Sequence, residues 1–200
     1  ITVNGTNDPA VLGAADVVLK ETNAALKTTG RLSIKDVDSP QTFVAQSDVA
    51  GANGSFSIDT SGRWSYVAKN SFDELNDGQN VSDSFTVASS DGTATTVKVT
   101  INGTNDAAVL SAANVVLTET DEALSTGGNL GISDVDSPES FVAQSDVSGK
   151  NGTFSIDRAG AWTYTANSAF DGLNVGKSVS DIFKVASADG TTTTVKITIK

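Results

Sequence analysis

The chain has 200 residues, with 13 Lys and Arg against 24 Asp and Glu, and its net charge is −11 at pH 7. Such a surface repels nucleic acid and anionic membranes and attracts cations, so we expect no nucleic-acid partner. The absence of Cys and His excludes disulfides, thiolate and imidazole metal ligands, and Ser-His or Cys-His catalytic pairs. No apolar run approaches the roughly 20 residues needed to cross a bilayer, so we expect no membrane insertion by this segment.

The sequence repeats itself with an offset of 98 residues and no insertion. Trp64 recurs as Trp162, and Asn4-Gly-Thr-Asn-Asp8 recurs as Asn102-Gly-Thr-Asn-Asp106. About two-thirds of the positions are identical, which indicates an array of domains of roughly 100 residues. Because the first residues match the end of the first copy, we expect the natural protein to continue in both directions. The predicted parts are the end of a preceding repeat with its linker (1–8), a first domain (9–101), a linker (102–106) and a second domain (107–200).

Alternation of apolar and polar residues predicts β-strands throughout each copy. In chain order, the first copy offers strands near Val11–Lys20, Leu32/Ile34, Phe43–Asp48, Phe56/Ile58, Trp64/Tyr66, Phe85/Val87 and Val97/Val99/Ile101. No stretch has a helical pattern. About seven strands per copy predict an all-β fold of two tandem immunoglobulin-like β-sandwiches.

Turn signals separate the predicted strands. Asn53-Gly54, Ser61-Gly62 and Asp91-Gly92 recur in the second copy, and Asn-Gly and Asp-Gly suit the positive φ of two-residue hairpins. A chance ion at Asp91-Gly92 is the minor alternative. Trp64 and Trp162 could stack on sugars, but their alternation with Tyr favours the core. Asn-x-Ser/Thr triplets are read as turns rather than glycosylation sites.

Acidic and amide side chains recur at four separated points of each copy. Asp36-Val-Asp38 is the most informative, because residues i and i+2 share a face in an extended segment. Two carboxylates about 7 Å apart would then repel each other unless a cation lay between them. Calcium takes six to eight oxygen ligands of these types, whereas soft metals lack ligands here. The alternative is that Asp36 caps a turn and that the linker is a tight corner.

The order of these motifs resembles a cadherin repeat. The succession is Asp36-Val-Asp-Ser-Pro40, Gly54-Ser-Phe-Ser-Ile-Asp59, Gly62-Arg-Trp64 and Phe72-Asp-Glu-Leu75, closed by Asn102-Gly-Thr-Asn-Asp106. More closely, the linkers, Asp-x-Asp and Phe-x-Val-x-x-x-Asp-Gly resemble the VCBS repeats of giant bacterial adhesins of the RTX type. The resemblance covers the chain twice, and it implies Ca²⁺ at the junctions between successive domains.

Carried onto this sequence, the resemblance implies one complete junction and two half-sites. The junction would use Glu21, Asp73, Asn105, Asp106, Asp134 and Asp136. One half-site would use Asn7, Asp8, Asp36 and Asp38, and the other Glu119 and Asp171. Gly103 replaces the first linker Asp of cadherins, Ala107 replaces their last Asn, and Asp73-Glu74 becomes Asp171-Gly172. These departures favour one or two ions per junction over three.

The resemblance implies a structural extender segment of a large bacterial cell-surface or secreted adhesin. Calcium would rigidify its junction, and the segment would support cell adhesion and biofilm formation outside the cell. The expected partners are adjacent repeats of the same chain, and we expect a monomer. The alternative is a glycan- or protein-binding module of the same surface protein. An enzyme is disfavoured, because a glycosidase needs its paired carboxylates inside a cleft.

Overall fold

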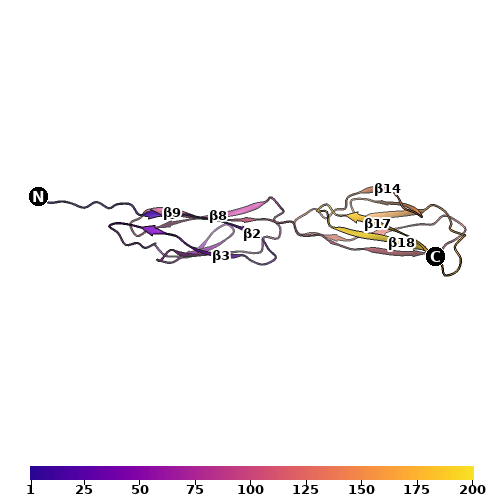
Figure 1. Cartoon of the computed structure of the whole chain (residues 1–200), viewed down its shortest axis with the longest axis horizontal. Helices are drawn as coiled ribbons and strands as arrows, with labels where there is room; N and C mark the ends of the chain where they lie inside the picture. Colours follow the sequence, from indigo (N-terminus) through magenta and orange to yellow (C-terminus); the bar gives the residue numbers. More distant parts are fainter. The chain divides into compact units, whose positions relative to one another are not determined.

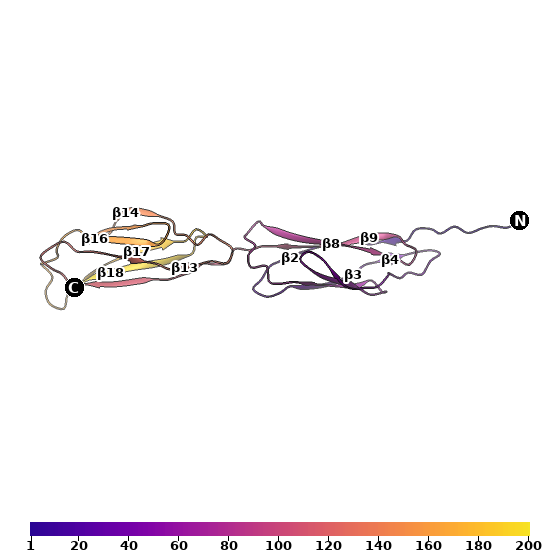
Figure 2. The ribbon, with the colours of Figure 1, turned by 180° about the vertical axis from the view of Figure 1, so that it is seen from behind.

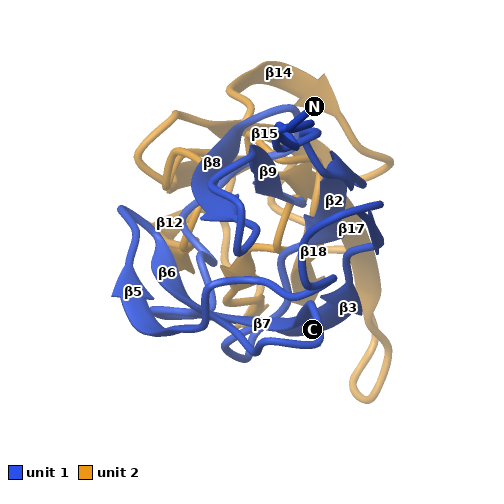
Figure 3. Ribbon diagram, turned by 90° about the vertical axis from the view of Figure 1, so that its left-hand side faces the viewer, with its two compact units in different colours: residues 1–104 blue, residues 105–200 orange.

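The structure is a computed structural model that describes all residues from 1 to 200. The chain divides into two compact units, residues 1–104 (unit 1) and 105–200 (unit 2), shown in blue and orange in Figure 3. Both consist of β-strands joined by turns, with no α-helix. The chain therefore has no helix that could span a membrane. The predicted all-β fold is confirmed.

Each unit contains nine strands, and the strands of unit 2 repeat those of unit 1 in order. In unit 1 they are β1 (Val11–Leu12), β2 (Ala15–Lys20), β3 (Lys27–Arg31), β4 (Ile34–Lys35), β5 (Gln46–Ala50), β6 (Gly54–Ile58), β7 (Arg63–Ala68), β8 (Asn80–Ala88) and β9 (Ala94–Asn102). In unit 2 they are β10 (Val109–Leu110), β11 (Ala113–Leu117), β12 (Ser125–Asn129), β13 (Ile132–Ser133), β14 (Gln144–Ser148), β15 (Gly152–Ile156), β16 (Ala161–Ala166), β17 (Val179–Ala186) and β18 (Thr192–Ile199).

Two sheets form the layers of each sandwich. In unit 1, β2-β9-β8 is one sheet and β3-β7-β6-β5 is the other, as Figure 1 shows by the separation of β8 and β9 from β3. Unit 2 repeats this with β11-β18-β17 and β12-β16-β15-β14, and Figure 2 labels β14 and β16 of one sheet and β17 and β18 of the other. The strand predicted over 11–20 is interrupted: β1 pairs with β4, and β2 runs parallel to β9. Without the two-residue strands, each unit has the seven expected.

The core of each sandwich contains the residues that the alternation of apolar and polar side chains predicted to be buried. Phe56 and Val97 are fully buried, and Trp64 is 4% exposed. The ring centroids of Phe56 and Phe85 lie 4.7 Å apart in a stacked arrangement, which joins the two sheets. The second core repeats this packing with Phe154 and Phe183. Trp64 and Trp162 are therefore core residues, and neither is a sugar-stacking platform.

The sequence predicted some of the glycine turns correctly, but not their lengths. Gly62 and Gly92 have φ of 80° and 90°, but they lie in loops of four and five residues between their strands, not in two-residue hairpins. Asn53-Gly54 is not such a turn, because Gly54 begins β6. A Cβ on Gly54 would lie 2.4 Å from the ring carbon Cζ of Tyr66. That glycine is required by close packing and not by its φ angle.

A buried carboxylate that the sequence did not reveal joins the sheets of unit 1. Asp83 is 6% exposed, and Oδ1 accepts hydrogen bonds from the backbone N–H of Ala52 at 2.9 Å and from Nδ2 of Asn53 at 3.1 Å. The Tyr66 hydroxyl donates to Oδ2 at 3.0 Å. Burial raises the pKa of Tyr66, and the hydrogen bond to Asp83 and the charge of that carboxylate raise it further. Asp181 holds Tyr164 and Asn151 in the same way.

Candidate metal centre

The Asp-x-Asp segment at the start of each sandwich is a turn rather than an extended strand. Oδ1 of Asp36 accepts the backbone N–H groups of Asp38 at 3.0 Å and Ser39 at 2.8 Å. The prediction that Asp36 and Asp38 share one face of an extended segment is therefore wrong, and the turn alternative is confirmed. However, the turn uses only one oxygen of Asp36. Its Oδ2 is buried and accepts no hydrogen bond, which is unfavourable for a carboxylate unless a cation or donor reaches it.

The Asn-Asp pair that precedes each sandwich is fixed to this turn. In unit 1, the Asp8 N–H donates to Oδ2 of Asp38 at 3.0 Å, and the Ser39 hydroxyl donates to Oδ1 of Asn7 at 2.9 Å. The sequence therefore brings all four residues of this predicted half-site together. Asp8 and Asn7 are nevertheless exposed.

Unit 2 repeats this arrangement with the predicted junction residues. Oδ1 of Asp134 accepts the backbone N–H groups of Asp136 and Ser137, and Oδ2 of Asp136 accepts the Asp106 N–H at 3.1 Å. The Ser137 hydroxyl donates to Oδ1 of Asn105 at 3.4 Å. Oδ2 of Asp134 is buried and accepts no hydrogen bond. Four of the six predicted junction residues thus lie together at the start of unit 2.

Negative charge is crowded at this end of unit 2. Burial raises the pKa of Asp136, and the neighbouring carboxylates of Asp134 and Asp106 raise it further, against the lowering effect of the Asp106 N–H. Proximity of like charges and loss of water both disfavour the ionised form. A bound cation would relieve both effects.

The remaining two junction residues lie together in unit 1. Glu21 follows β2 and is 3% exposed; its Oε1 accepts the Thr104 N–H at 3.0 Å and also the Thr104 hydroxyl. Carboxylate oxygens of Glu21 and Asp73 lie within 4.8 Å of each other. Oε2 of Glu21 and Oδ1 of Asp73 are buried and accept no hydrogen bond. Two such oxygens facing one another repel in the absence of a cation.

An unusual backbone conformation precedes Asp73. Phe72 has a φ of 65°, a region that bulky residues rarely adopt. Its side chain is 6% exposed in the core, and its N–H is bonded to Oδ1 of Asn70 at 3.1 Å. Core packing of the Phe72 side chain therefore stabilises a strained backbone turn. This turn fixes the position of the next residue, Asp73. Phe170 repeats this φ before Asp171.

The corresponding end of unit 2 is more open. Glu119 is half-buried and Asp171 is exposed. The Glu119 N–H is bonded to the carbonyl of Lys200, the last residue of the sequence, at 2.9 Å. In unit 1, the hydrogen bonds to Glu21 come from Thr104, two residues after Asn102, which corresponds to Lys200.

Gly103 is required where cadherin linkers carry an Asp. A Cβ at Gly103 would lie 2.1 Å from the carbonyl oxygen of Leu75 and 2.5 Å from that of Asn76. The Gly103 N–H donates to the Gln79 carbonyl at 2.9 Å. The linker backbone is therefore packed against the loop that carries Asp73, and there is no room for a side chain.

We expect Gly103→Ala to lower the melting temperature of unit 1 and to weaken Ca²⁺ binding, because either the linker or the loop must shift. Overpacking of this kind costs about 1–3 kcal/mol. Gly5→Ala is the matched control, since Gly5 occupies the same place in the repeat and a Cβ there would meet nothing within 4 Å. Calorimetric melting of both variants checks this, and equal melting temperatures would contradict it.

The Asp91-Gly92 turn has a structural role, because Asp91 accepts hydrogen bonds that stabilise the fold. Oδ2 of Asp91 accepts the Ala10 N–H at 2.9 Å, and Oδ1 accepts the Thr93 N–H at 3.0 Å. The hydrogen bond from the Ser89 hydroxyl, followed by these backbone N–H groups, holds the pKa of Asp91 well below its usual range. Oδ2 thus attaches the chain before β1 to the β8–β9 loop, and Oδ1 accepts hydrogen bonds within that loop. The turn reading of this motif is confirmed.

The donor set of both ends fits a hard divalent cation. It consists of carboxylate and amide oxygens, several of them buried with no hydrogen bond, and it lacks nitrogen and sulfur ligands. Calcium accepts such sets with flexible geometry, while Mg²⁺ requires a tighter octahedron. The residues that would hold Ca²⁺ are Glu21 and Asp73 in unit 1, and Asp106, Asp134 and Asp136 in unit 2.

Several solved structures match the chain at low sequence identity. Solved structures that resemble the chain include Drosophila N-cadherin EC1-4, at 17% identity and a TM-score of 0.45, covering 97% of this chain and 50% of that one. Protocadherin gammaB7 EC3-6 has 12% identity and a TM-score of 0.46, with 96% and 48% covered. Human desmocollin-1 has 15% identity and a TM-score of 0.37, with 94% and 40% covered. The chain thus spans about half the length, or less, of these proteins.

No curated protein matches the sequence significantly. The family described as bacterial cadherin-like domain matches twice, over residues 7–103 and 105–200. These two ranges cover nearly the whole sequence. The chain is two tandem members of the bacterial cadherin-like domain family.

Proposed function

We propose that the chain is a calcium-rigidified extender segment of a large bacterial adhesin of the RTX type, built from VCBS repeats. It would lie outside the cell, on the bacterial surface or secreted, and support cell adhesion and biofilm formation. Its partners would be the adjacent repeats of the same chain.

The observation that carries the proposal is the way each end of the linker is attached. Thr104 donates two hydrogen bonds to Glu21 of unit 1. Two residues later, Asp106 donates its N–H to Asp136 of unit 2. Consecutive Cα atoms are 3.8 Å apart, so a single residue separates the two attachment points, and we infer that one ion can bind both acidic groups.

The proposed mechanism is electrostatic. Without metal, each close pair of carboxylates repels by about 1–4 kcal/mol, depending on the local dielectric, and the short linker acts as a hinge. With Ca²⁺, the same carboxylates share one coordination shell and fix the two units in one orientation. Extracellular calcium modules have dissociation constants of about 10⁻⁴–10⁻³ M, which suits a calcium-rich medium outside the cell.

Asp136→Ala tests this proposal. We expect it to reduce Ca²⁺ binding at the junction by at least tenfold while both sandwiches keep their folds, because Asp136 lies in the loop before β14 and its Oδ2 accepts the N–H of the linker residue Asp106. Asp38→Ala is the matched control, since Asp38 has the same place in unit 1 but lies outside the proposed junction. Calcium titration by calorimetry on both variants is the measurement. Equal loss in the two variants, or global unfolding of the Asp136→Ala chain, would contradict the assignment.

A further inference from the structure

The outer face of one sheet differs in charge between the two units. In unit 1, the exposed side chains of β3 and β7 include three cations, whereas the corresponding positions of β12 and β16 in unit 2 are uncharged. We call the first surface the cationic face. Its cations are Lys27, Arg31 and Arg63, and their counterparts are Ser125, Asn129 and Ala161.

The sandwich does not need these cations to fold. Arg31 lies directly opposite Arg63 in the β3–β7 register, and like charges in such cross-strand pairs are destabilising. Unit 2 forms the same pairs of strands with Asn129 opposite Ala161. The net charges of the units are nearly equal, with 7 Lys and Arg against 12 Asp and Glu in unit 1, and 6 against 12 in unit 2. The difference is therefore local to this face.

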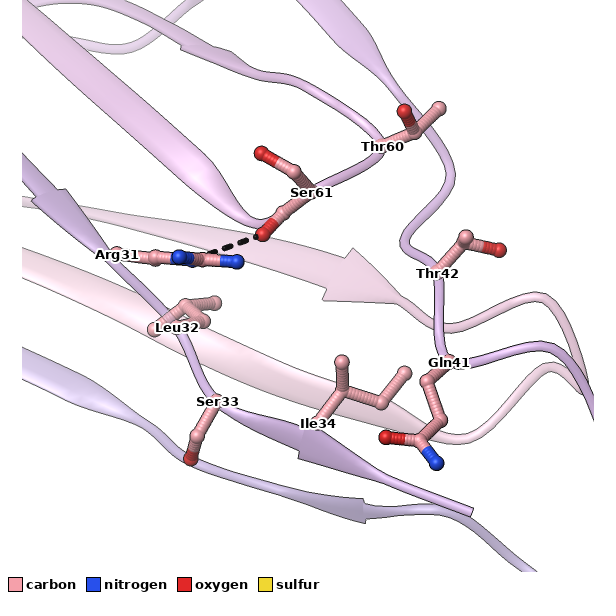
Figure 4. Close-up of a pocket in the computed structure, with 8 residues that line it drawn as sticks. All are labelled: Arg31, Leu32, Ser33, Ile34, Gln41, Thr42, Thr60 and Ser61. Atoms are coloured by element: carbon pink, nitrogen blue, oxygen red, sulfur yellow. Dashed lines mark hydrogen bonds between the residues drawn. The ribbon is translucent and has the colours of Figure 1, made fainter.

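The cations border two shallow cavities. One, of about 630 Å³, is lined by Thr29, Gly30, Arg31, Arg63, Trp64 and Ser65. The other, of about 560 Å³, lies on the far side of Arg31 and is lined mainly by polar residues, among them Gln41, Thr42, Thr60 and Ser61. Figure 4 shows the Arg31 side chain extended beside this second cavity, with Nε donating to the Ser61 carbonyl at 3.2 Å. That hydrogen bond holds the guanidinium at the border of both cavities.

One nearby carboxylate, Asp59, interacts electrostatically with Arg63, but it also accepts hydrogen bonds from its own turn. Oδ1 of Asp59 accepts the Ser61 N–H, the Ser61 hydroxyl and the Arg63 N–H. Asp59 and Asp48 both recur in unit 2, as Asp157 and Asp146. Both units therefore have the same acidic residues near this face. The two units differ there by the three cations of unit 1. Unit 2 has one cation of its own in the β15–β16 loop, Arg158.

We infer that the cationic face of unit 1 binds an acidic polysaccharide. Guanidinium groups bind carboxylate and sulfate in a bidentate way, and the hydroxyls of Thr29 and Ser65 supply partners for sugar hydroxyls. The face exposes only one large apolar side chain, Val67 at 39%, so it lacks the apolar centre of a protein–protein interface. This role is additional to the calcium-dependent extender function and uses none of its residues.

The test exchanges the two faces. The loss variant is Lys27→Ser, Arg31→Asn and Arg63→Ala together, and the gain variant is Ser125→Lys, Asn129→Arg and Ala161→Arg together. Every replacement occurs naturally at the same position of the other unit, so both chains should fold, which melting curves verify. Binding of heparin (sulfated), alginate (carboxylated) and neutral dextran is measured by calorimetry in EGTA, which removes any bridging by Ca²⁺.

We expect the wild-type chain to bind at least one acidic polysaccharide and not dextran, with affinity falling as salt rises. The loss variant should bind roughly tenfold or more weakly, because charge-assisted hydrogen bonds are lost. The gain variant should carry a second site of similar affinity. Equal binding by wild-type and loss variant, binding of none of the polysaccharides, or cation-dependent binding only to DNA or to a second copy of the chain would overturn the inference. None of these results would affect the calcium proposal.

Discussion

Removal of Ca²⁺ with EGTA should lower the melting temperature of the chain by about 5–10 °C. At 10 mM Ca²⁺, one site with a dissociation constant of about 10⁻⁴–10⁻³ M stabilises the native state by roughly 1.4–2.7 kcal/mol through mass action. Each kcal/mol shifts the melting temperature of a domain of this size by about 4 °C. Unit 1 should respond most, since Glu21 and Asp73 are brought together there with buried oxygens that accept no hydrogen bond.

Scanning calorimetry in Ca²⁺, in EGTA and in Mg²⁺ is the measurement. Re-addition of Ca²⁺ should restore the original melting curve, and Mg²⁺ at the same concentration should restore much less of it. A melting curve that does not change between Ca²⁺ and EGTA would show that the acidic groups coexist without a divalent ion.

Asp83→Ala should destabilise unit 1 by about 3–5 kcal/mol. The substitution leaves the buried Tyr66 hydroxyl and the Asn53 side-chain and backbone donors without their acceptor, and each unsatisfied donor costs about 1–3 kcal/mol. The carboxylate also joins the two sheets, because Asp83 lies on β8 and Tyr66 on β7. Chemical denaturation of the variant, followed by Trp64 fluorescence, measures the loss.

Two variants serve as controls for this network. Tyr66→Phe removes one of the donors together with its hydroxyl and should cost only about 1 kcal/mol. Asp181→Ala should reproduce the full effect in unit 2, because Tyr164 and Asn151 contact Asp181 in the same way. If Asp83→Ala costs no more than Tyr66→Phe, the carboxylate is not the centre of the network.

Much of the fold could be predicted because period-2 alternation depends only on which side of a strand a residue faces. Phe56, Trp64 and Val97 are buried as that pattern required. The prediction of a positive-φ turn at Asn53-Gly54 was wrong because a glycine can serve either a positive φ or a close contact. Only the packing against Tyr66 distinguishes the two. Asp83 was missed although the alternation places it on the buried face with Phe85 and Val87, because a carboxylate is normally expected to face solvent.

The candidate site could be predicted less completely. Sequence order suggested which residues would meet, and Glu21 with Asp73, and Asp106 with Asp134 and Asp136, do lie together within their units. The turn at Asp36 could not be read from the sequence, since Asp-x-Asp suits both an extended pair and a capped turn. The role of Phe72 depends on its positive φ angle, and the role of Gly103 depends on its close contact with backbone carbonyls. Neither property produces a recognisable pattern in a single sequence.

Small-angle X-ray scattering of the chain in Ca²⁺ and in EGTA tests the junction most directly. If a shared ion fixes the two units, the Ca²⁺ profile should give one well-defined maximum dimension, and the EGTA profile should give a broad distribution of distances. A variant with a flexible Gly-Ser insert between Thr104 and Asn105 should give the broad distribution in both conditions. Superimposable wild-type profiles with and without Ca²⁺ would contradict calcium as the source of the rigidity.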